Sequence, residues 1–258
     1  MERAGALARA AWGSTLEGMA STDALLARYI DTSWGYGRLT APYWFVGMEQ
    51  GGGDDWPGFR DGLERWQASG APAMHALRPD PADRAASPWF GPRAQIQPYW
   101  GKVSRIYLAA EGMPCDTAAV RRYQIEQLAA PDADTCLLEL LPLPSPSTTH
   151  WLYGEHSDLS MLRDRAAYRA QVAPTRVAAL RAMIDVHAPR YVVFVGLSYT
   201  QHWNSVADTD LPTRPERPVT SPDGRSRMTI ARHPSSYGVT NAYFEQIGRT
   251  LAGDHRTI

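Results

Sequence analysis

The segment YWFVGMEQGGG, residues 43 to 53, runs from aromatic and apolar residues into a methionine, a carboxylate, an amide and three glycines. A nearly continuous apolar run predicts a strand that is buried on both faces, as the strands of parallel sheets are. The glycines that follow have two interpretations. They form a tight turn before a helix, or they keep the backbone open so that something bulky can approach a reactive carboxylate at Glu49.

Three other apolar runs also predict strands, and helical patterns separate them. With the first run, the strands are PYWFVG (42–47), DTCLLELLPL (134–143), RYVVFVG (190–196) and RMTIAR (227–232). The helical patterns cover residues 59–67, 101–112, 118–129, 168–188 and 238–253, with Pro174 as a kink or a new start in the fourth. Strands that alternate with helices predict a single α/β domain with a short, mostly parallel sheet. Residues 1–38 are expected to form a helical N-terminal extension of this domain.

Two long segments exceed what a minimal fold of this kind needs. Residues 69–100 are rich in Pro and Gly with aromatic residues between them, and residues 207–226 are polar, Pro-rich and contain several arginines. Loops of this length in a compact domain are usually functional or disordered. The embedded aromatic residues favour a packed, functional loop for the first segment.

The composition is that of a globular protein without a strong charge of either sign. Apolar residues make up 44% of the chain and the net charge is -1, so any contact with nucleic acid needs a local basic patch. Cys115 and Cys136 are too few for a zinc or iron–sulfur site and are expected to be small buried thiols in a reducing compartment. The N-terminus lacks the apolar core of a secretory signal, and no apolar run reaches the roughly 20 residues that span a membrane. We therefore expect a cytoplasmic protein.

Polar residues stand at the ends of the predicted strands, where open α/β sheets bind their ligands. Met48, Glu49 and Gln50 follow the first strand. Glu139 lies among leucines in the second strand, where a carboxylate is costly unless it is paired or serves a site; the alternative is a residue that emerges into solvent. The segment RHPSSYG (232–238) follows the fourth strand, and its serines could equally cap the final helix.

Four segments together resemble the motifs of the uracil-DNA glycosylase superfamily. They are VGMEQGG (46–52), LLELLPLP (137–144), YVVFVG (191–196) and ARHPSSYG (231–238), in the order that the family shows. The resemblance spans residues 40–252 and is closest at Gly47 and at the His-Pro-Ser tripeptide. It implies a three-layer α/β/α fold around a short, mostly parallel four-stranded sheet. It also implies removal of a base from DNA with no metal and no organic cofactor.

The departures from the family's first motif point to a bulky base. Glu49 falls where one type of this motif carries its catalytic aspartate, so it would stabilise the sugar cation and position water. Met48 stands at a Gln or Glu position of the family and contributes only backbone and bulk. Gly51 replaces a tyrosine that blocks substituents at the 5 position of the base, which opens that position. Asp54 and Asp55 remain alternatives to Glu49 as the catalytic carboxylate.

Glu139 takes the place of the asparagine that reads uracil in this family. An ionised glutamate only accepts hydrogen bonds, so it disfavours the O4 atom of uracil and suits the exocyclic amine of cytosine. A proton shared with cytosine N3 would satisfy both hydrogen bonds. With the open 5 position, this implies a 5-modified cytosine, and glucosylated hydroxymethylcytosine of phage DNA fits, as in phage-defence glycosylases of the superfamily. His233 would donate to the base oxygen that gains charge as the base departs.

Further residues are expected to contact DNA around the flipped base. The candidates are Ser145, Ser147, Arg232, Ser235, Ser236 and Tyr237, with Tyr237 as a wedge that enters the duplex. Arg225, Arg227, Thr148 and Thr149 could add phosphate contacts. Trp89 and Phe90, or Trp56 and Phe59, could stack on the base or pack in the core. The arginines could instead form a solvated charged edge of the protein. The hydroxyl residues could instead belong to a plain Pro-Ser turn.

Other functions remain open besides excision of a modified cytosine. The enzyme could remove uracil or a damaged base, or a glycosylase-like fold could bind modified DNA without cutting it. A serine hydrolase would use Ser198, Asp210 and His233, and a metal hydrolase would use His150, His156 and Asp158.

Overall fold

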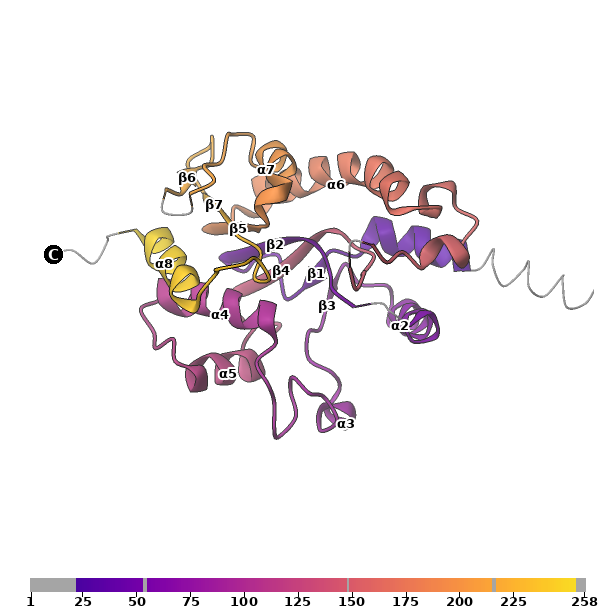
Figure 1. The fold of residues 1–258 in the computed structure, drawn as a ribbon, viewed down its shortest axis with the longest axis horizontal. Helices are drawn as coiled ribbons and strands as arrows, with labels where there is room; N and C mark the ends of the chain where they lie inside the picture. Colours follow the sequence, from indigo (N-terminus) through magenta and orange to yellow (C-terminus); the bar gives the residue numbers. More distant parts are fainter. Residues whose placement is uncertain (1–21, 53–54, 148, 215–216, 254–258) are drawn as a thin grey trace, which may run out of the picture. The chain divides into compact units, whose positions relative to one another are not determined.

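The computed structural model describes residues 22–52, 55–147, 149–214 and 217–253 (Figure 1). These residues form two compact units. The helical unit contains the described residues up to Ser33, together with Glu49–Ala73 and Leu141–Arg176. The sheet unit contains Trp34–Met48, Met74–Leu140 and the described residues from Val177 onward.

A seven-stranded sheet forms the centre of the sheet unit, in the order β3-β1-β4-β2-β5-β7-β6. Its long strands are β2 (Tyr43–Glu49), β4 (Thr135–Leu141), β5 (Tyr191–Val195) and β7 (Arg227–Ala231), which confirms the four predicted strands. β2 and β7 each pair with β5 in parallel. The carboxyl ends of these three strands therefore share one edge of the sheet.

Three two-residue strands enlarge the sheet beyond the four strands predicted. They are β1 (Gly35–Tyr36), β3 (Met74–His75) and β6 (Val219–Thr220). β1 pairs with β3 in parallel and with β4 in antiparallel orientation, and β6 is antiparallel to β7. The predicted sheet was therefore too small, and the observed sheet is mixed. Two residues are too few for an apolar alternation to show in a sequence.

Helices fill the segments between the long strands and confirm all five helical patterns. Their bounds are α2 (Trp56–Ala68), α3 (Pro81–Arg84), α4 (Pro98–Ala110), α5 (Thr117–Glu126), α6 (Arg165–His187), α7 (Thr200–Ala207) and α8 (Asn241–Ala252). Short 3₁₀ turns add η1 (Tyr153–Glu155), η2 (Ser160–Leu162) and η3 (Leu197–Tyr199). Residues 22–32 form a further helix inside the predicted extension, of which residues 1–21 lie outside the described residues. Pro174 lies within α6, which does not restart there. No helix among the described residues is long and apolar enough to cross a membrane.

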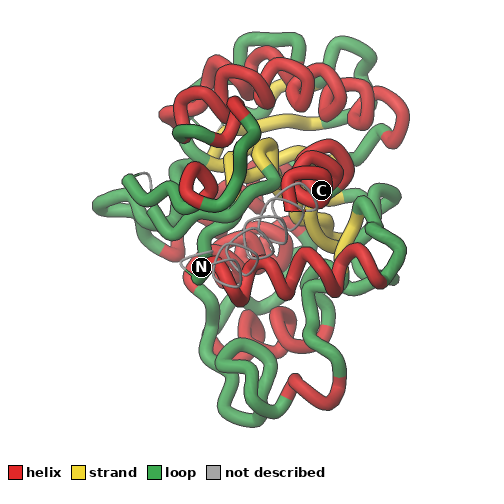
Figure 2. The backbone as a smooth tube through the Cα atoms, turned by 90° about the vertical axis from the view of Figure 1, so that its right-hand side faces the viewer, coloured by secondary structure: helices red, strands yellow, loops and turns green. Residues whose placement is uncertain are grey.

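Helices cover both faces of the sheet within the sheet unit (Figure 2). Alternate residues of a strand point to opposite faces of the sheet, so the side chains of β5 contact the helices on both faces. Tyr191 and Val193 belong to the apolar cluster that contains Ile106 of α4 and Phe244 of α8. On the other face, the ring of Phe194 stacks on Trp203 of α7 with centroids 5.3 Å apart. These contacts explain why β5 reads as an uninterrupted apolar run.

The long loop before α4 is packed through one buried side chain of α5, Gln124. Its amide nitrogen donates to the carbonyl oxygens of Trp89 and Gln95, both at 2.9 Å. Its amide oxygen accepts from the backbone N–H of Gln97 at 3.0 Å. Phe90 in the same loop is buried. The predicted packing of this loop is confirmed, while its functional role stays a prediction.

The helical unit is built around aromatic side chains. Tyr29 packs edge-on against Trp66 of α2 with centroids 4.9 Å apart, and Trp151 lies 5.1 Å from Tyr168 of α6. The buried guanidinium of Arg176 donates to the carbonyl oxygen of Ile30. Polar groups at helix ends are thereby paired inside an otherwise apolar interior.

Candidate functional site

The carboxyl group of Glu139 lies against the backbone of Gly47. β4 and β2 are neighbours in the sheet, and a Cβ atom built on Gly47 would lie 2.4 Å from Oε2 of Glu139. Leu138 and Leu140 on either side of the glutamate are completely buried. A side chain at position 47 would therefore force the carboxyl group of Glu139 to move.

Burial raises the pKa of Glu139 to about 8. The residue as a whole is partly exposed, but Oε2 is inaccessible to solvent. The buried Oε2 does not fit a side chain that simply emerges into solvent. At neutral pH the carboxyl group holds its proton, so it donates one hydrogen bond and accepts others. The raised pKa of Glu139 favours the protonated form over the ionised form assumed from the sequence, because the apolar neighbourhood disfavours the charge.

Tyr99, in the first turn of α4, lies close to Glu139, and the sequence analysis missed it. Burial raises the pKa of this tyrosine well above its usual value, and the negative charge of Glu139 raises it further. The ring packs against the apolar cluster of the sheet unit. Its phenolic oxygen is buried and has no hydrogen-bond partner among the described residues. A tyrosine in a Pro- and aromatic-rich stretch gives no signal of such a position.

Glu49, the last residue of β2, forms an ion pair with Arg165 at the start of α6, inside the helical unit. Each of the two side chains is only 14% exposed. Arg165 contacts Oε1, while Oε2 is buried and has no hydrogen-bond partner among the described residues. The guanidinium favours the ionised carboxylate. Arg165 is a second residue that the sequence analysis missed, since nothing in the sequence links it to Glu49.

Ser145 and Ser147 belong to the same hydrogen-bond network as Arg165. The guanidinium donates to Oγ of Ser145 at 2.8 Å and to the carbonyl oxygen of Ser147 at 2.9 Å. Ser145 is buried, and its hydroxyl also bonds the carbonyl oxygens of Ser147 and His150. Ser147 is exposed, with its hydroxyl 3.1 Å from that of Thr149. Ser145 therefore orders this loop, and the exposed Ser147 is the better candidate for a DNA contact. Thr148 lies outside the described residues.

The glycines after Glu49 lead into a helix and also leave the backbone open, while the reactivity of Glu49 stays a prediction. Asp55 caps α2 by accepting from the backbone N–H of Gly58 at 2.9 Å, so the segment does lead into a helix. A Cβ atom on Gly51 or Gly52 would meet nothing within 4 Å, so the backbone there is also open. Met48 is buried in the sheet unit. Gly53 and Asp54 lie outside the described residues.

His233 follows β7 on an exposed loop that fixes its tautomer. Its Nδ1 accepts from the backbone N–H of Ser235 at 3.2 Å, which places the ring hydrogen on Nε2. The residue is exposed overall, yet partial burial of the ring lowers the pKa of His233 from its usual value. A neutral imidazole with a hydrogen on Nε2 can donate one hydrogen bond to a ligand.

The rest of this loop presents polar groups and one aromatic ring to solvent. Arg232, Ser235 and Ser236 are exposed, and Tyr237 is 101% exposed. The loop does not cap the final helix through its serines, because Thr240 does so by accepting from the backbone N–H of Tyr243. The serines are thus left available for other contacts.

The residues of the rival interpretations have other contacts. Asp210 accepts from Asn204, and no hydrogen bond joins Ser198, Asp210 and His233 in the part of the chain that the structure describes. The ring of His156 stacks on Trp56 with centroids 4.5 Å apart. Among the described residues, no three His, Cys, Asp or Glu side chains gather in a way that could hold a metal ion.

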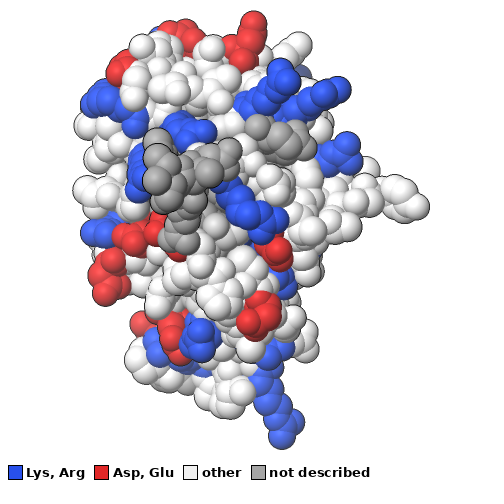
Figure 3. Space-filling view, turned by 90° about the vertical axis from the view of Figure 1, so that its left-hand side faces the viewer, with Lys and Arg blue, Asp and Glu red and all other residues white. Residues whose placement is uncertain are grey.

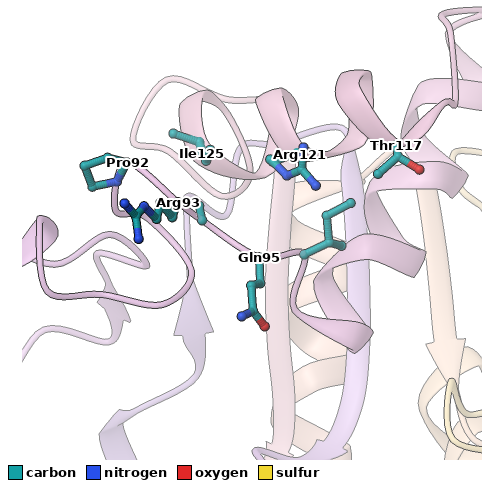
Figure 4. A pocket seen from close by; sticks show the side chains of 8 residues that line it. Pro92, Arg93, Gln95, Thr117, Arg121 and Ile125 are labelled. Carbon is teal, nitrogen blue, oxygen red and sulfur yellow. The ribbon is translucent and has the colours of Figure 1, made fainter.

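Two cavities of the sheet unit lie away from the predicted site residues. One of about 710 Å³ is lined by Tyr43 and Tyr191, the first residues of β2 and β5, so it opens at their amino ends. The other, of about 490 Å³, is an open hollow between residues 92–96 and α5, lined by Arg93 and Arg121 among others (Figure 4). Basic and acidic side chains are interspersed on the face drawn in Figure 3.

Comparison with known proteins does not assign a function, so any functional proposal has to be argued from the residues described above. No protein-family model matches the chain, and no curated protein matches it.

Proposed function

We propose that this protein is a DNA glycosylase that hydrolyses the N-glycosidic bond of a 5-modified cytosine, with glucosylated hydroxymethylcytosine of phage DNA as the substrate that fits best. The sheet unit would then have the three-layer fold of the uracil-DNA glycosylase superfamily. The observation that carries the proposal is the buried carboxyl group of Glu139 against Gly47. A carboxyl group in an apolar strand is costly unless it is paired or serves a site, and we assign it to a site.

The protonated carboxyl group matches the Watson–Crick edge of cytosine. Its hydroxyl donates to N3 and its carbonyl oxygen accepts from the exocyclic amine. When the bond between C1′ and N1 breaks, its electron pair stays on the base. The proton that passes from Glu139 to N3 then keeps the departing base neutral, which lowers the barrier to its release.

The same carboxyl group could also pair with uracil, so Glu139 alone does not select the base. Selection for a modified cytosine therefore rests on the 5 position. Gly51 offers no side chain to exclude a substituent, and a Cβ there would meet nothing within 4 Å. A sugar-bearing base needs such room, whereas a uracil-specific enzyme gains by closing it.

Glu49 supplies the negative charge next to the sugar in this proposal. The ion pair with Arg165 favours the ionised carboxylate, and Oε2, which has no hydrogen-bond partner among the described residues, would orient the water that adds to C1′ once the substrate is bound. His233 contributes the Nε2 hydrogen to the base oxygen, and the exposed ring of Tyr237 takes the place of the extruded nucleotide.

The test is mass spectrometry of small molecules that the purified protein releases from DNA. The substrates are glucosylated hydroxymethylcytosine phage DNA, uracil-containing DNA and unmodified DNA. We expect release of the sugar-bearing base only, and loss of release in Glu49→Gln. Asp208→Asn is the matched control, because it also removes an arginine-paired carboxylate, at an exposed position with a left-handed backbone that asparagine tolerates.

The other outcomes separate the alternatives. Release of uracil would keep glycosylase activity and contradict the role given to the 5 position. Tight binding of modified DNA without release of any base would contradict catalysis and identify a modified-DNA-binding module.

A further inference from the structure

The hydroxyl group of Tyr99 is buried but makes no hydrogen bond within the described part of the protein. Its oxygen has no hydrogen-bond partner among the described residues, although the ring is packed against the core of the sheet unit. A buried donor without a partner destabilises the folded state, and folded proteins seldom retain one. A ligand that supplied the missing partner would explain why tyrosine rather than phenylalanine stands here.

The position of Tyr99 is set by its neighbours and not by its own hydroxyl. Gln97 caps α4 by accepting from the backbone N–H of Trp100 at 2.7 Å, and the Gln97 backbone is itself bonded to Gln124. The first turn of the helix is therefore anchored at both the side chain and the backbone. Tyr99 follows Pro98, which favours the helical start. A hydroxyl held in this way is preorganised for a ligand.

Glu139 lies two residues along β4 from Leu137, which belongs to the cluster that the Tyr99 ring contacts, so the two side chains share one face of the sheet. A ligand that reaches the Tyr99 hydroxyl on this face can therefore also reach Glu139. We propose that the hydroxyl of Tyr99 is a second hydrogen-bonding group for the base that Glu139 binds. This inference rests on the proposed function, since it names a further specificity residue of the same site. The phenol keeps its hydrogen at neutral pH, so it can donate to an oxygen of the base or of its 5-substituent, or accept from an amine.

The contact is tested by equilibrium binding in a background that does not cleave. Glu49→Gln protein, with and without Tyr99→Phe, is titrated with a duplex that contains one glucosylated hydroxymethylcytosine and with the same duplex carrying an abasic site. We expect Tyr99→Phe to weaken binding of the modified duplex roughly tenfold and to leave binding of the abasic duplex unchanged. The stability of Tyr99→Phe should equal or exceed that of the unchanged protein, because an unpaired buried hydroxyl is removed.

Tyr123→Phe is the matched control. Its hydroxyl lies 2.9 Å from Oγ1 of Thr135, so this internal tyrosine should lose stability on substitution while the ratio of the two affinities stays the same. Equal weakening of both duplexes by Tyr99→Phe, or no weakening, overturns the role of Tyr99 and leaves base release by the unchanged protein intact. Absence of base release by the unchanged protein overturns the proposed function and the role of Tyr99 together.

Discussion

The carboxyl group of Glu139 occupies the space into which a side chain at Gly47 would extend. The two residues come from neighbouring strands, and each determines what the other can be. A larger residue at position 47 would displace the carboxyl group, and loss of the carboxyl group would remove the need for glycine. Gly47 and Glu139 are therefore one structural feature.

Gly47→Ala should destabilise the protein by about 1–3 kcal/mol, because the new methyl group overlaps the carboxyl group. Gly47 does not have a positive φ, so alanine meets no backbone strain there. In the Gly47→Ala/Glu139→Ala double variant, the two substitutions should cost less than their sum. Urea unfolding of the four proteins measures this coupling. Gly51→Ala is the control and should be neutral, since its Cβ meets nothing within 4 Å. Strict additivity would contradict the steric account.

The pH dependence of stability should carry the signature of Glu139. Its pKa is raised from 4.5 to about 8 in the folded protein, so the folded state holds this proton more tightly than the unfolded chain does. The stabilisation is complete below about pH 4.5 and is lost as the pH rises to about 8. The free energy of unfolding, measured relative to Glu139→Gln, should therefore fall across this interval and then level off. If the free energies of unfolding of the two proteins changed in parallel from pH 5 to 9, Glu139 would not have a raised pKa in the folded state. Base release should also decline above pH 8, where the proton for N3 is missing.

Arg165→Met should destabilise the helical unit by about 3–5 kcal/mol, because it leaves the carboxylate of Glu49 buried without its cation. The Arg165→Met/Glu49→Gln variant should recover much of this loss, since the buried charge is gone. Thermal unfolding of the two variants shows whether the double variant is the more stable. Arg181→Met is the control, because it breaks an exposed pair with Asp208 and should cost no more than about 1 kcal/mol. If Arg165→Met and Arg181→Met destabilised the protein equally, the ion pair of Glu49 would contribute no more than an exposed pair.

Gly51→Tyr should restrict the substrate without unfolding the protein. The position is exposed and a Cβ atom there meets nothing within 4 Å, so we expect the variant to fold with unchanged stability. The added ring would exclude a substituent at the 5 position of the base. Release of glucosylated hydroxymethylcytosine, relative to hydroxymethylcytosine, should fall by roughly tenfold or more, measured by mass spectrometry on paired DNA substrates. Gly51→Ala provides the small-residue comparison. If the ratio of the two release rates did not change, Gly51 would not determine which substituent the protein accepts.

The long strands were predictable because their residues are apolar on both faces. The run at Tyr191–Val195 is buried throughout, which is the pattern that a strand covered on both sides must have. The two-residue strands were not predictable, since β1 depends on its partners and not on its own composition. The helix cap at Thr240 was also missed, because Ser235 and Ser236 nearby offer the same chemistry.

The candidate site was predictable as a set of residues but not as a set of interactions. The leucines around Glu139 marked the carboxylate as unusual, yet its protonation depends on packing that brings distant segments together. Arg165 and Tyr99 are the clearest omissions. Each becomes relevant only through folding, which places Arg165 on Glu49 and Tyr99 near Glu139. Ordinary arginines and tyrosines elsewhere in the chain look the same in sequence.

Gln124 holds three backbone groups of the segment between Trp89 and Gln97 with a single amide. The anchors are main-chain atoms, which every residue type supplies. The exposed side chains of this segment can therefore be substituted without changing its path into α4. Gln97, which one of these bonds holds, also caps the first turn of α4. Gln124 thus sets where Tyr99 lies without touching it, and its loss would move a residue two positions beyond its last contact.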